Sequence, residues 1–503
     1  MSLARVYSRA AVGVDAPEVT VEVHVGGGLP RVSLVGLPQT AVRESKDRVK
    51  AALLNAGFRF PDGLVTISLA PADLPKDGSR FDLPIALGIL AASGQVADRR
   101  FGEIEFVGEL ALGGGLNPVR GVLPVAIQSG RAGRKLVVPA IDGSEAALAS
   151  QAHVLCADSL LAVVAWLDGK SRLNPAEPMP PARAANGKDL SDVYGQARAR
   201  RALEVAAAGS HNLLFSGPPG TGKTMLASRL PGILPPMTED EALEAAAVAS
   251  VSQAGLDLAR WRRRPFRAPH HTASSAALVG GGSQPRPGEI SLAHHGVLFL
   301  DELPEFNRNV LEVLREPMES GRIVISRAAC YAEFPARFQL IAAMNPCSCG
   351  YHGDKSGRCQ CTSEQVRRYR GKISGPLLDR IDIHVEVGRP PRAVINGQGQ
   401  NPENSAMVRE RVVTARSRQL DRNGIPNAQL NNARVREICR LTPQLERLLE
   451  AAAETMNLSP RACQRILKVS RTLADMDGRE SIEQGHLAEA LVYRGIDRNL
   501  MQS

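Results

Sequence analysis

Residues 217 to 224 read Gly217-Pro218-Pro219-Gly220-Thr221-Gly222-Lys223-Thr224. The segment before them, Asn212-Leu-Leu-Phe-Ser216, predicts a short buried strand, and the segment after them predicts a helix. In this context the glycines let backbone N–H groups close around a phosphate at the helix N-terminus. The Lys223 ammonium then meets the outer phosphates, and the Thr224 hydroxyl holds Mg²⁺. The stretch therefore predicts a nucleotide-binding α/β fold.

A second motif supplies the other half of a nucleotide-hydrolysing site. The apolar run Gly-Val-Leu-Phe-Leu ends in Asp301-Glu302, as expected for a strand buried on both faces of a parallel sheet. Asp301 would join the metal shell, and Glu302 would orient and activate water. A glycine-rich loop beside an ordinary buried strand would not account for Lys, Thr, Asp and Glu at these places. The two motifs together predict hydrolysis of ATP with Mg²⁺.

A third polar side chain follows another buried strand. Residues 338 to 344 are apolar apart from Gln339 and lead to Asn345. If this strand lies beside the one that ends at Asp301, Asn345 can hydrogen-bond the attacking water or the terminal phosphate. The alternative is a turn residue that ends a strand.

Two arginines are candidates for charge stabilisation. Arg380 lies in Leu377-Leu-Asp379-Arg380-Ile-Asp382, and a guanidinium that reaches a neighbouring active site stabilises phosphoryl transfer and requires a ring. The alternative is a pair with Asp379 or Asp382 in its own subunit. Ser459-Pro-Arg461 predicts a helix start, from which Arg461 would meet the nucleotide or simply face solvent.

The segment between Glu319 and Arg337 alternates with period two around a short turn, which predicts a β-hairpin. In a ring, its tip would point into the pore, where Arg327 would grip a DNA phosphate. The alternative is a strand residue in a salt bridge.

A chain of 503 residues is too long for one core and predicts two to four domains. Strand-like stretches at 19–25, 63–69 and 135–138 alternate with helical ones near 39–56 and 82–93. The sequence divides into an α/β domain, a proline-rich linker, the ATPase core with a cysteine-rich insertion, a hinge and a helical lid. Their predicted bounds are 1–170, 171–189, 190–389 with 347–361 as the insertion, 390–404 and 405–503.

The net charge of +9 makes a polyanionic partner plausible. Two basic stretches carry aromatic residues, Arg260 to Arg267 with Trp261 and Phe266, and Arg367 to Lys372 with Tyr369. Guanidinium groups would follow phosphates while rings stack on bases; a solvated or subunit-interface face is the alternative. No run of about 18 apolar residues and no signal peptide is present, so we expect a soluble, cytoplasmic protein without a membrane partner.

The cysteines Cys347, Cys349, Cys359 and Cys361 form two Cys-x-Cys pairs around a glycine-rich loop. Four soft ligands with a flexible connector suit a structural, tetrahedral Zn²⁺. A redox-active pair or an incidental cluster is the alternative, and His352 could replace one ligand. The remaining cysteines, which we interpret as small core residues, are Cys156, Cys330, Cys439 and Cys463.

The order of these motifs resembles the AAA+ branch that contains magnesium chelatase ATPase subunits and the minichromosome-maintenance helicases. The whole chain resembles the bacterial YifB/ComM family, through Phe-Arg-Ala-Pro-His-His at 266–271, Pro-Gly-Glu-Ile-Ser-Leu-Ala-His-His at 287–295, Leu-Asp-Glu-Leu-Pro-Glu-Phe at 300–306 and Asn-Pro-Cys-Ser-Cys-Gly at 345–350. Its members are hexameric DNA motors implicated in branch migration during natural transformation. The resemblance implies a trans-acting finger at Arg380, a first sensor at Asn345 and a second sensor at Arg461.

The N-terminal segments 75–80 and 108–112 resemble the proteolytic domain of Lon, which has the ribosomal S5 domain 2-like fold. Arg80 stands where the resemblance would place the nucleophilic serine, and Leu123 stands near the expected lysine. Ser79 is one residue off, and a serine without an activating base is a poor nucleophile. We therefore expect a scaffold or a nucleic-acid-contacting domain without the catalytic dyad.

Together these features predict an ATP-dependent hexameric DNA translocase or helicase. It would promote branch migration on single-stranded and branched DNA, with recombination proteins as possible partners. The alternative is a motor that remodels a protein partner, as the magnesium chelatase subunit does. Steeply salt-dependent DNA binding would separate the two.

Overall fold

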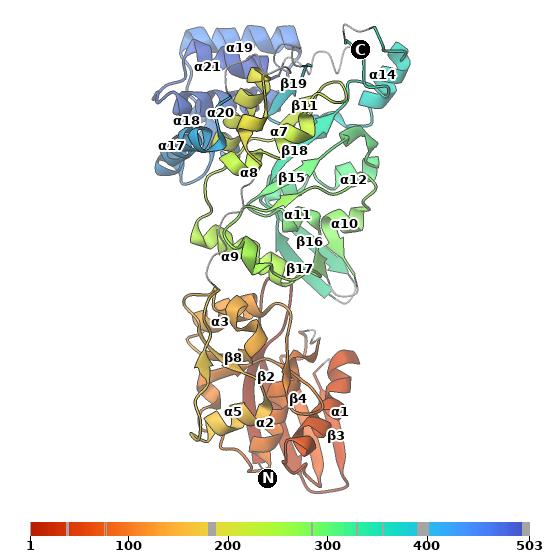
Figure 1. The fold of residues 1–503 in the computed structure, drawn as a ribbon, viewed down its shortest axis with the longest axis vertical. Helices are drawn as coiled ribbons and strands as arrows, with labels where there is room; N and C mark the ends of the chain where they lie inside the picture. Colours follow the sequence, from red (N-terminus) through yellow and green to blue (C-terminus); the bar gives the residue numbers. More distant parts are fainter. Residues whose placement is uncertain are drawn as a thin grey trace.

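The computed structural model describes residues 2–36, 40–74, 76, 78–179, 188–282, 285–327, 330–354, 357–389 and 402–494. Figure 1 shows the N-terminal region at one end, the C-terminal helices at the other, and a second α/β region between them. Mixed α/β architecture, expected from the sequence, is confirmed. Among the described helices, none combines the length and apolar character needed to cross a bilayer.

The N-terminal region is built on an eight-stranded sheet in the order β10-β9-β8-β5-β1-β2-β4-β3. Its strands are β1 (Ser2–Arg9), β2 (Glu18–Gly26), β3 (Arg31–Val35), β4 (Leu64–Ala70), β5 (Ile104–Phe106), β8 (Lys135–Pro139), β9 (His153–Ala157) and β10 (Asn174–Pro175), with a small pair β6 (Glu109–Leu110) and β7 (Leu116–Asn117). Its helices are α1 (Thr40–Asn55), α2 (Asp82–Ala92), α3 (Val122–Arg131), α4 (Gly143–Ala146) and α5 (Leu160–Leu167). The strands and helices expected here are confirmed. Two residues of the predicted linker form β10, and residues 180–187 lie outside the described part of the chain.

The central region contains a parallel sheet in the order β12-β15-β18-β11-β19. Its strands are β12 (Phe266–Arg267), β15 (Val297–Leu300), β18 (Gln339–Met344), β11 (Leu213–Ser216) and β19 (Ile383–Glu386). The four residues of β11 and of β15 are all buried, which explains their continuous apolar sequence. Because the strands are parallel, the segments that follow β11, β15 and β18 meet at one edge. The helices of this region are α6 (Ala197–Gly209), α7 (Lys223–Ala227), α8 (Leu230–Ile233), α12 (Arg308–Glu312), α13 (Pro317–Ser320), α14 (Ser363–Arg370) and α15 (Gly375–Leu378).

An insertion lies between β11 and β15, and a hairpin follows β15. The insertion contains α9 (Glu239–Ser250), α10 (Ser275–Val279), β13 (Gly280–Gly281), β14 (Arg286–Pro287) and α11 (Glu289–Leu292). The predicted hairpin is confirmed: β16 (Arg322–Arg327) pairs antiparallel with β17 (Cys330–Pro335). In Figure 1 it points from the central region toward the N-terminal region.

The C-terminal region is helical over the described residues, as expected. Its helices are α17 (Ser405–Asn423), α18 (Asn432–Ile438), α19 (Pro443–Met456), α20 (Pro460–Met476) and α21 (Gln484–Val492). Residues from α17 and α20 share a core with α6 and the parallel sheet. Most of the predicted hinge, residues 390–401, lies outside the described part of the chain.

The N-terminal and central regions share an apolar cluster. Val122 and Ala126 of α3 pack with Ala246 of α9, and Trp261 borders the same cluster. The Gly121 amide donates to the Ser250 carbonyl at 3.2 Å, and the Ser250 hydroxyl donates to a Glu145 carboxylate. These contacts join α9 of the central region to α3 and α4 of the N-terminal region.

The structure shows where the aromatic residues of the two basic stretches pack; stacking on bases and a solvated or interface face were the alternatives. Trp261 packs in the cluster between the two regions. Phe266 stacks on Phe299 of β15, with ring centroids 6.0 Å apart, and Tyr369 is buried in the core. The exposed side chains of the second stretch are those of Arg367, Arg368 and Lys372, and Arg370 is half-buried. Helix α14 turns the tyrosine of this stretch inward and leaves three of its cations exposed.

Candidate ATPase site

The phosphate loop connects β11 to α7, as the sequence predicts. Lys223 is the first residue of α7, and its ammonium donates to Gly217 O at 2.7 Å, Pro218 O at 2.9 Å and Asn345 Oδ1 at 3.0 Å. Burial lowers the pKa of Lys223, while Asp301 and Glu302 oppose that shift. Gly220 and Gly222 have φ of 75° and 89°, the left-handed backbone that glycine adopts without strain. The carbonyl oxygens of the loop thus hold the Lys223 ammonium, and two of its glycines occupy positions that require left-handed backbone.

The acidic pair lies beside the loop. The Thr224 hydroxyl donates to Asp301 Oδ2 at 2.6 Å, so the start of helix α7 and the end of strand β15 each supply one hard oxygen ligand for Mg²⁺. Hydroxyl and carboxylate oxygens are the donors that Mg²⁺ prefers, and this pair fits the ion. The Glu302 amide donates to Asp301 Oδ1 at 3.0 Å, which fixes the two acids relative to each other.

Glu302 has a partner that the motif analysis missed. His271 Nδ1 lies 3.3 Å from Glu302 Oε2, and its ring packs edge-on against Phe306 at 6.4 Å. His270 instead contacts the Thr272 hydroxyl at 2.9 Å. The signal in the sequence was the adjacent His-His pair at the end of a basic stretch. Its distance in sequence from Glu302 concealed this contact.

Asn345 lies where the expectation placed it. Strand β18 pairs in parallel with both β15 and β11, so Asn345 follows the strand between the phosphate loop and the Asp301-Glu302 pair. Its Oδ1 accepts from Lys223. A side-chain amide between the lysine and the two acids can report whether a terminal phosphate is bound.

Arg380 and Arg461 lie together at a different carboxylate. Arg380 Nη2 is 2.7 Å from Glu319 Oε1, and Arg461 Nη1 is 4.0 Å from the same oxygen. The pairing of Arg380 with Asp379 or Asp382, considered as an alternative, is therefore wrong. Asp382 binds Arg465 at 2.9 Å, and Asp379 accepts from the Ser459 hydroxyl at 3.3 Å.

The start of the Arg461 helix follows the prediction. Ser459 caps α20 by accepting from the Ala462 amide, with Pro460 in the first turn. The Arg461 side chain is 63% exposed and the Arg380 side chain 8%. For Arg327, the structure describes the backbone at the end of β16 but not the side chain, so its contact with DNA stays a prediction.

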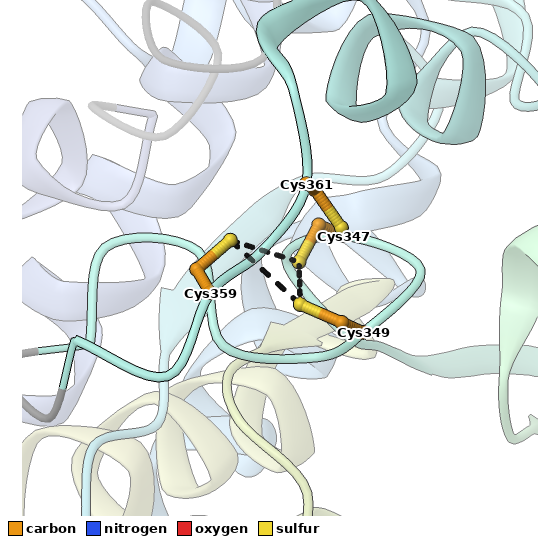
Figure 2. Close-up of side chains that lie close together, drawn as sticks. All are labelled: Cys347, Cys349, Cys359 and Cys361. Atoms are coloured by element: carbon orange, nitrogen blue, oxygen red, sulfur yellow. Dashed lines mark hydrogen bonds between the residues drawn. The ribbon is translucent and has the colours of Figure 1, made fainter.

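The cysteine cluster follows Asn345 directly. The sulfur of Cys347 lies 3.3 Å from that of Cys349 and 3.9 Å from that of Cys359, and the latter two are 3.7 Å apart. With Cys361, all four sulfurs lie within 4.8 Å of one another, and Figure 2 shows them converging from both ends of the loop. Tetrahedral Zn²⁺ with bonds of about 2.3 Å needs sulfurs about 3.8 Å apart. The donor set therefore fits zinc.

His352 contributes its backbone to this cluster. Its amide donates to Cys347 Sγ at 3.3 Å, which favours the four sulfurs as the ligands. Cys439 is buried in the C-terminal core and Cys156 borders the cluster of α3 and α9, in agreement with their interpretation as core residues. Cys463 is half-buried, and the Cys330 side chain lies outside the described part of the chain.

In the described part of the N-terminal region, the side-chain partner of the Ser79 hydroxyl is a carboxylate and not a lysine or histidine. The Ser79 hydroxyl donates to Glu109, Arg80 donates to the Arg120 carbonyl at 2.7 Å, and Leu123 is fully buried. A hydroxyl that donates to a carboxylate without a lysine or histidine beside it gains little nucleophilicity. The arginine at the aligned position holds a loop instead.

The sheet order, the phosphate loop, the Asp301-Glu302 pair and the C-terminal helices define an AAA+ ATPase of the magnesium chelatase type. Family models match three consecutive parts: "Subunit ChlI of Mg-chelatase" at residues 21–142, "Magnesium chelatase, subunit ChlI" at 189–395 and "Magnesium chelatase, subunit ChlI C-terminal" at 402–494.

Comparison with whole proteins gives matches over the full length of this chain. The chain is 52% identical over 507 residues to competence protein ComM of Haemophilus influenzae, covering 100% of this chain and 99% of the relative. It is 50% identical over 501 residues to uncharacterized protein YifB of Escherichia coli, with the same coverage. A 38 kDa magnesium-chelatase subunit of Cereibacter sphaeroides is 29% identical over 118 residues, 24% of this chain and 28% of the relative. The chain belongs to the ComM/YifB family of magnesium-chelatase-like AAA+ ATPases.

Proposed function

We propose that this ATPase is a homohexameric DNA translocase that promotes branch migration of recombination intermediates, as in natural transformation. The observation that carries the ring is the position of Arg380 and Arg461. Both arginines lie at Glu319, whereas the residues proposed to bind the nucleotide lie around Lys223. An arginine pair apart from its own phosphate loop is arranged to serve the loop of a neighbouring subunit.

Each residue of the site then has one task. Lys223 binds the outer phosphates, Glu302 orients water with the help of His271, and Asn345 senses the terminal phosphate. Arg380 acts in trans as the finger and Arg461 as the second sensor. Mg²⁺, held by Thr224 and Asp301, supplies charge neutralisation when bound. These roles match the expected chemistry of a ring ATPase.

DNA as the substrate is supported by charge and by similarity. The chain carries a net charge of +9, and the exposed cations Arg367, Arg368 and Lys372 lie on or just beyond α14. The relative with the highest quoted identity is named a competence protein. Arg327 at the hairpin tip would grip the DNA backbone, single-stranded and branched DNA would be the substrates, and recombination proteins would assist in the cytoplasm.

The N-terminal region would be a Lon-like scaffold without proteolytic activity, which steers the substrate toward the hairpin. The contact between Gly13 and the Glu333 carbonyl supports this: a Cβ on Gly13 would lie 2.8 Å from that oxygen. The predicted boundaries, with the ATPase core at 190–389 and the lid at 405–503, belong to the same proposal.

The deciding experiment is ATP hydrolysis with and without single-stranded, duplex and four-way-junction DNA at two salt concentrations. Lys223→Ala is the inactive control. We expect stimulation that is largest for the junction and weakens steeply with salt. Hydrolysis that ignores every DNA would instead favour a protein-remodelling motor, the alternative that the magnesium chelatase models support.

We also propose a structural Zn²⁺ at the four cysteines. Metal analysis of the purified protein should find close to one zinc per chain, and Cys359→Ser should lower that content. Cys463→Ser, which changes a half-buried cysteine outside the cluster, is the control. Zinc-free protein with full ATPase activity would contradict a structural role.

A further inference from the structure

Glu319 lies at the junction of the arginine pair and the hairpin. It belongs to α13 (Pro317–Ser320), and its Oε1 contacts Arg380 at 2.7 Å while lying 4.0 Å from Arg461. The Glu319 side chain is 49% exposed, whereas that of Arg380 is 8% exposed. One carboxylate that solvent reaches thus stands in front of a buried guanidinium.

The charges around Glu319 are unbalanced. Burial is the largest cause that lowers the pKa of Arg380, and the nearby positive charges of Arg315 and Arg465 lower it further. Arg315 is neutralised by Glu312 at 2.5 Å and Arg465 by Asp382 at 2.9 Å. Glu319 is therefore the carboxylate that Arg380 and Arg461 share. A phosphate carries more negative charge and more acceptor oxygens than one carboxylate, so it would compete strongly for the same two arginines.

Glu319 is also mechanically close to the hairpin. Only Gly321 separates α13 from β16. Gly321 has φ of 70°, and a Cβ on it would lie 3.0 Å from Arg337 Cγ. The Ser320 hydroxyl donates to Arg322 O at 3.0 Å, and the Ala336 amide donates to Gly321 O at 2.8 Å. A tight turn with these bonds would pass a shift of α13 to both hairpin strands.

We propose that Glu319 is a positioning residue, which holds Arg380 and Arg461 until the terminal phosphate of ATP on the neighbouring subunit replaces it. The released α13 then moves the hairpin. This inference rests on the ring proposed above and adds its coupling: the nucleotide of one subunit sets the hairpin position of the next.

The test compares Glu319→Gln with Glu316→Gln, an exposed glutamate three residues earlier. Glu319→Gln removes the competitor for phosphate, so we expect the KM for ATP without DNA to fall about fivefold. The kcat should stay within about twofold, since no group that touches the reacting atoms changes. The DNA strand displaced per ATP hydrolysed should fall, because the hairpin no longer responds to the nucleotide. Glu316→Gln should match the wild type in all three quantities.

One further variant and the contradicting outcomes complete the test. Glu319→Asp keeps the charge on a shorter side chain and should give an intermediate KM; it also replaces Glu319→Gln if that variant does not fold. A lower melting temperature with unchanged KM would show a merely structural ion pair and overturn the proposal, as would equal KM values for both Gln variants. If the wild type displaces no strand, the proposed DNA function fails. The KM comparison still tests whether the phosphate of ATP replaces Glu319 at the two arginines.

Discussion

Glu302 adopts a backbone conformation that few glutamates adopt, with φ of 53°. Strain of this kind persists where the surroundings fix it and is common at reactive sites. The Asp301 carboxylate accepts from its amide, and His271 lies 3.3 Å from its side chain. The orientation of the proposed water-activating acid therefore depends on a histidine from the inserted segment.

His271→Ala should lower the kcat for ATP hydrolysis by up to about 100-fold with little change in KM, because a misplaced base slows chemistry more than binding. The matched control is His270→Ala, which removes the neighbouring ring but leaves the contact with Glu302. Steady-state kinetics of both variants provide the measurement. An equal loss in the two would mean that the segment matters only for folding.

Asp142 predicts a pH dependence of stability. Burial raises its pKa from 3.8 to about 7; the Val119 amide opposes the shift, nearby Glu145 reinforces it and Arg80 opposes it. The folded state keeps the proton up to about pH 7, whereas the unfolded chain loses it near pH 4. The unfolded state thus binds fewer protons in this window, and stability falls as pH rises across it.

Asp142→Asn removes this ionisation, and its amide oxygen can still accept from the Val119 N–H. The variant should melt at a higher temperature than the wild type at pH 8, and this difference should be clearly smaller at pH 5, which lies closer to the pKa of the carboxyl in the unfolded chain. Thermal unfolding at both values checks this. Parallel pH profiles for the two proteins would show that Asp142 is ionised in the folded state.

Among the elements, the cysteine-rich loop lies against the phosphate loop. A Cβ on Gly350 would lie 2.7 Å from Pro219 Cδ, whereas one on Gly353 would have no atom within 4 Å. Both glycines have positive φ, 86° and 77°, so alanine at either site costs about 1–2 kcal/mol of strain. Only Gly350→Ala also pushes on the phosphate loop.

We therefore expect Gly350→Ala to raise the KM for ATP or the Kd of a nucleotide analogue by about tenfold or more, the effect of roughly 1.4 kcal/mol. Gly353→Ala should lower the melting temperature without that effect. Nucleotide titration of the two variants separates strain from contact. Equal affinities would show that the loop moves away from Pro219 without consequence.

At this scale the sequence predicted much of the site but little of its surroundings. The strands that end at Asp301 and Asn345 were predictable because parallel strands buried on both faces are apolar throughout. The pairing of Arg380 with Glu319 was not, since nothing in local periodicity joins residues so far apart. The roles of Trp261 and Phe266 stayed open for a related reason. An aromatic ring among arginines has the same sequence pattern whether it faces DNA or a neighbouring helix.

For the whole molecule, the decisive contact is between α3 and α9. Helix α9 touches the N-terminal region through Ala246, and its Glu244 binds His294 and His295 at 3.0 and 2.8 Å, just before the strand that leads to Asp301. The His294 Nδ1 accepts from the Arg337 amide at 3.0 Å. Its Nε2 therefore carries the proton and donates to Glu244, so this cluster is a hydrogen-bonded link and not a metal site.

The N-terminal region is thereby connected to both the β15 strand and the end of the hairpin. Ala246→Asp places an unpaired charge in the shared cluster, where Ala246 is 4% exposed, at a cost of roughly 3 kcal/mol. The two regions should separate: Trp261 emission should shift to the red, ATP hydrolysis without DNA should persist, and stimulation by junction DNA should fall.

Ala245→Asp, at a half-buried position one residue earlier, carries the same charge on the same helix and should keep the stimulation. If Ala246→Asp shifts the emission but keeps full stimulation, the N-terminal region does not transmit the response to DNA, and the coupling lies within the ring of ATPase cores alone.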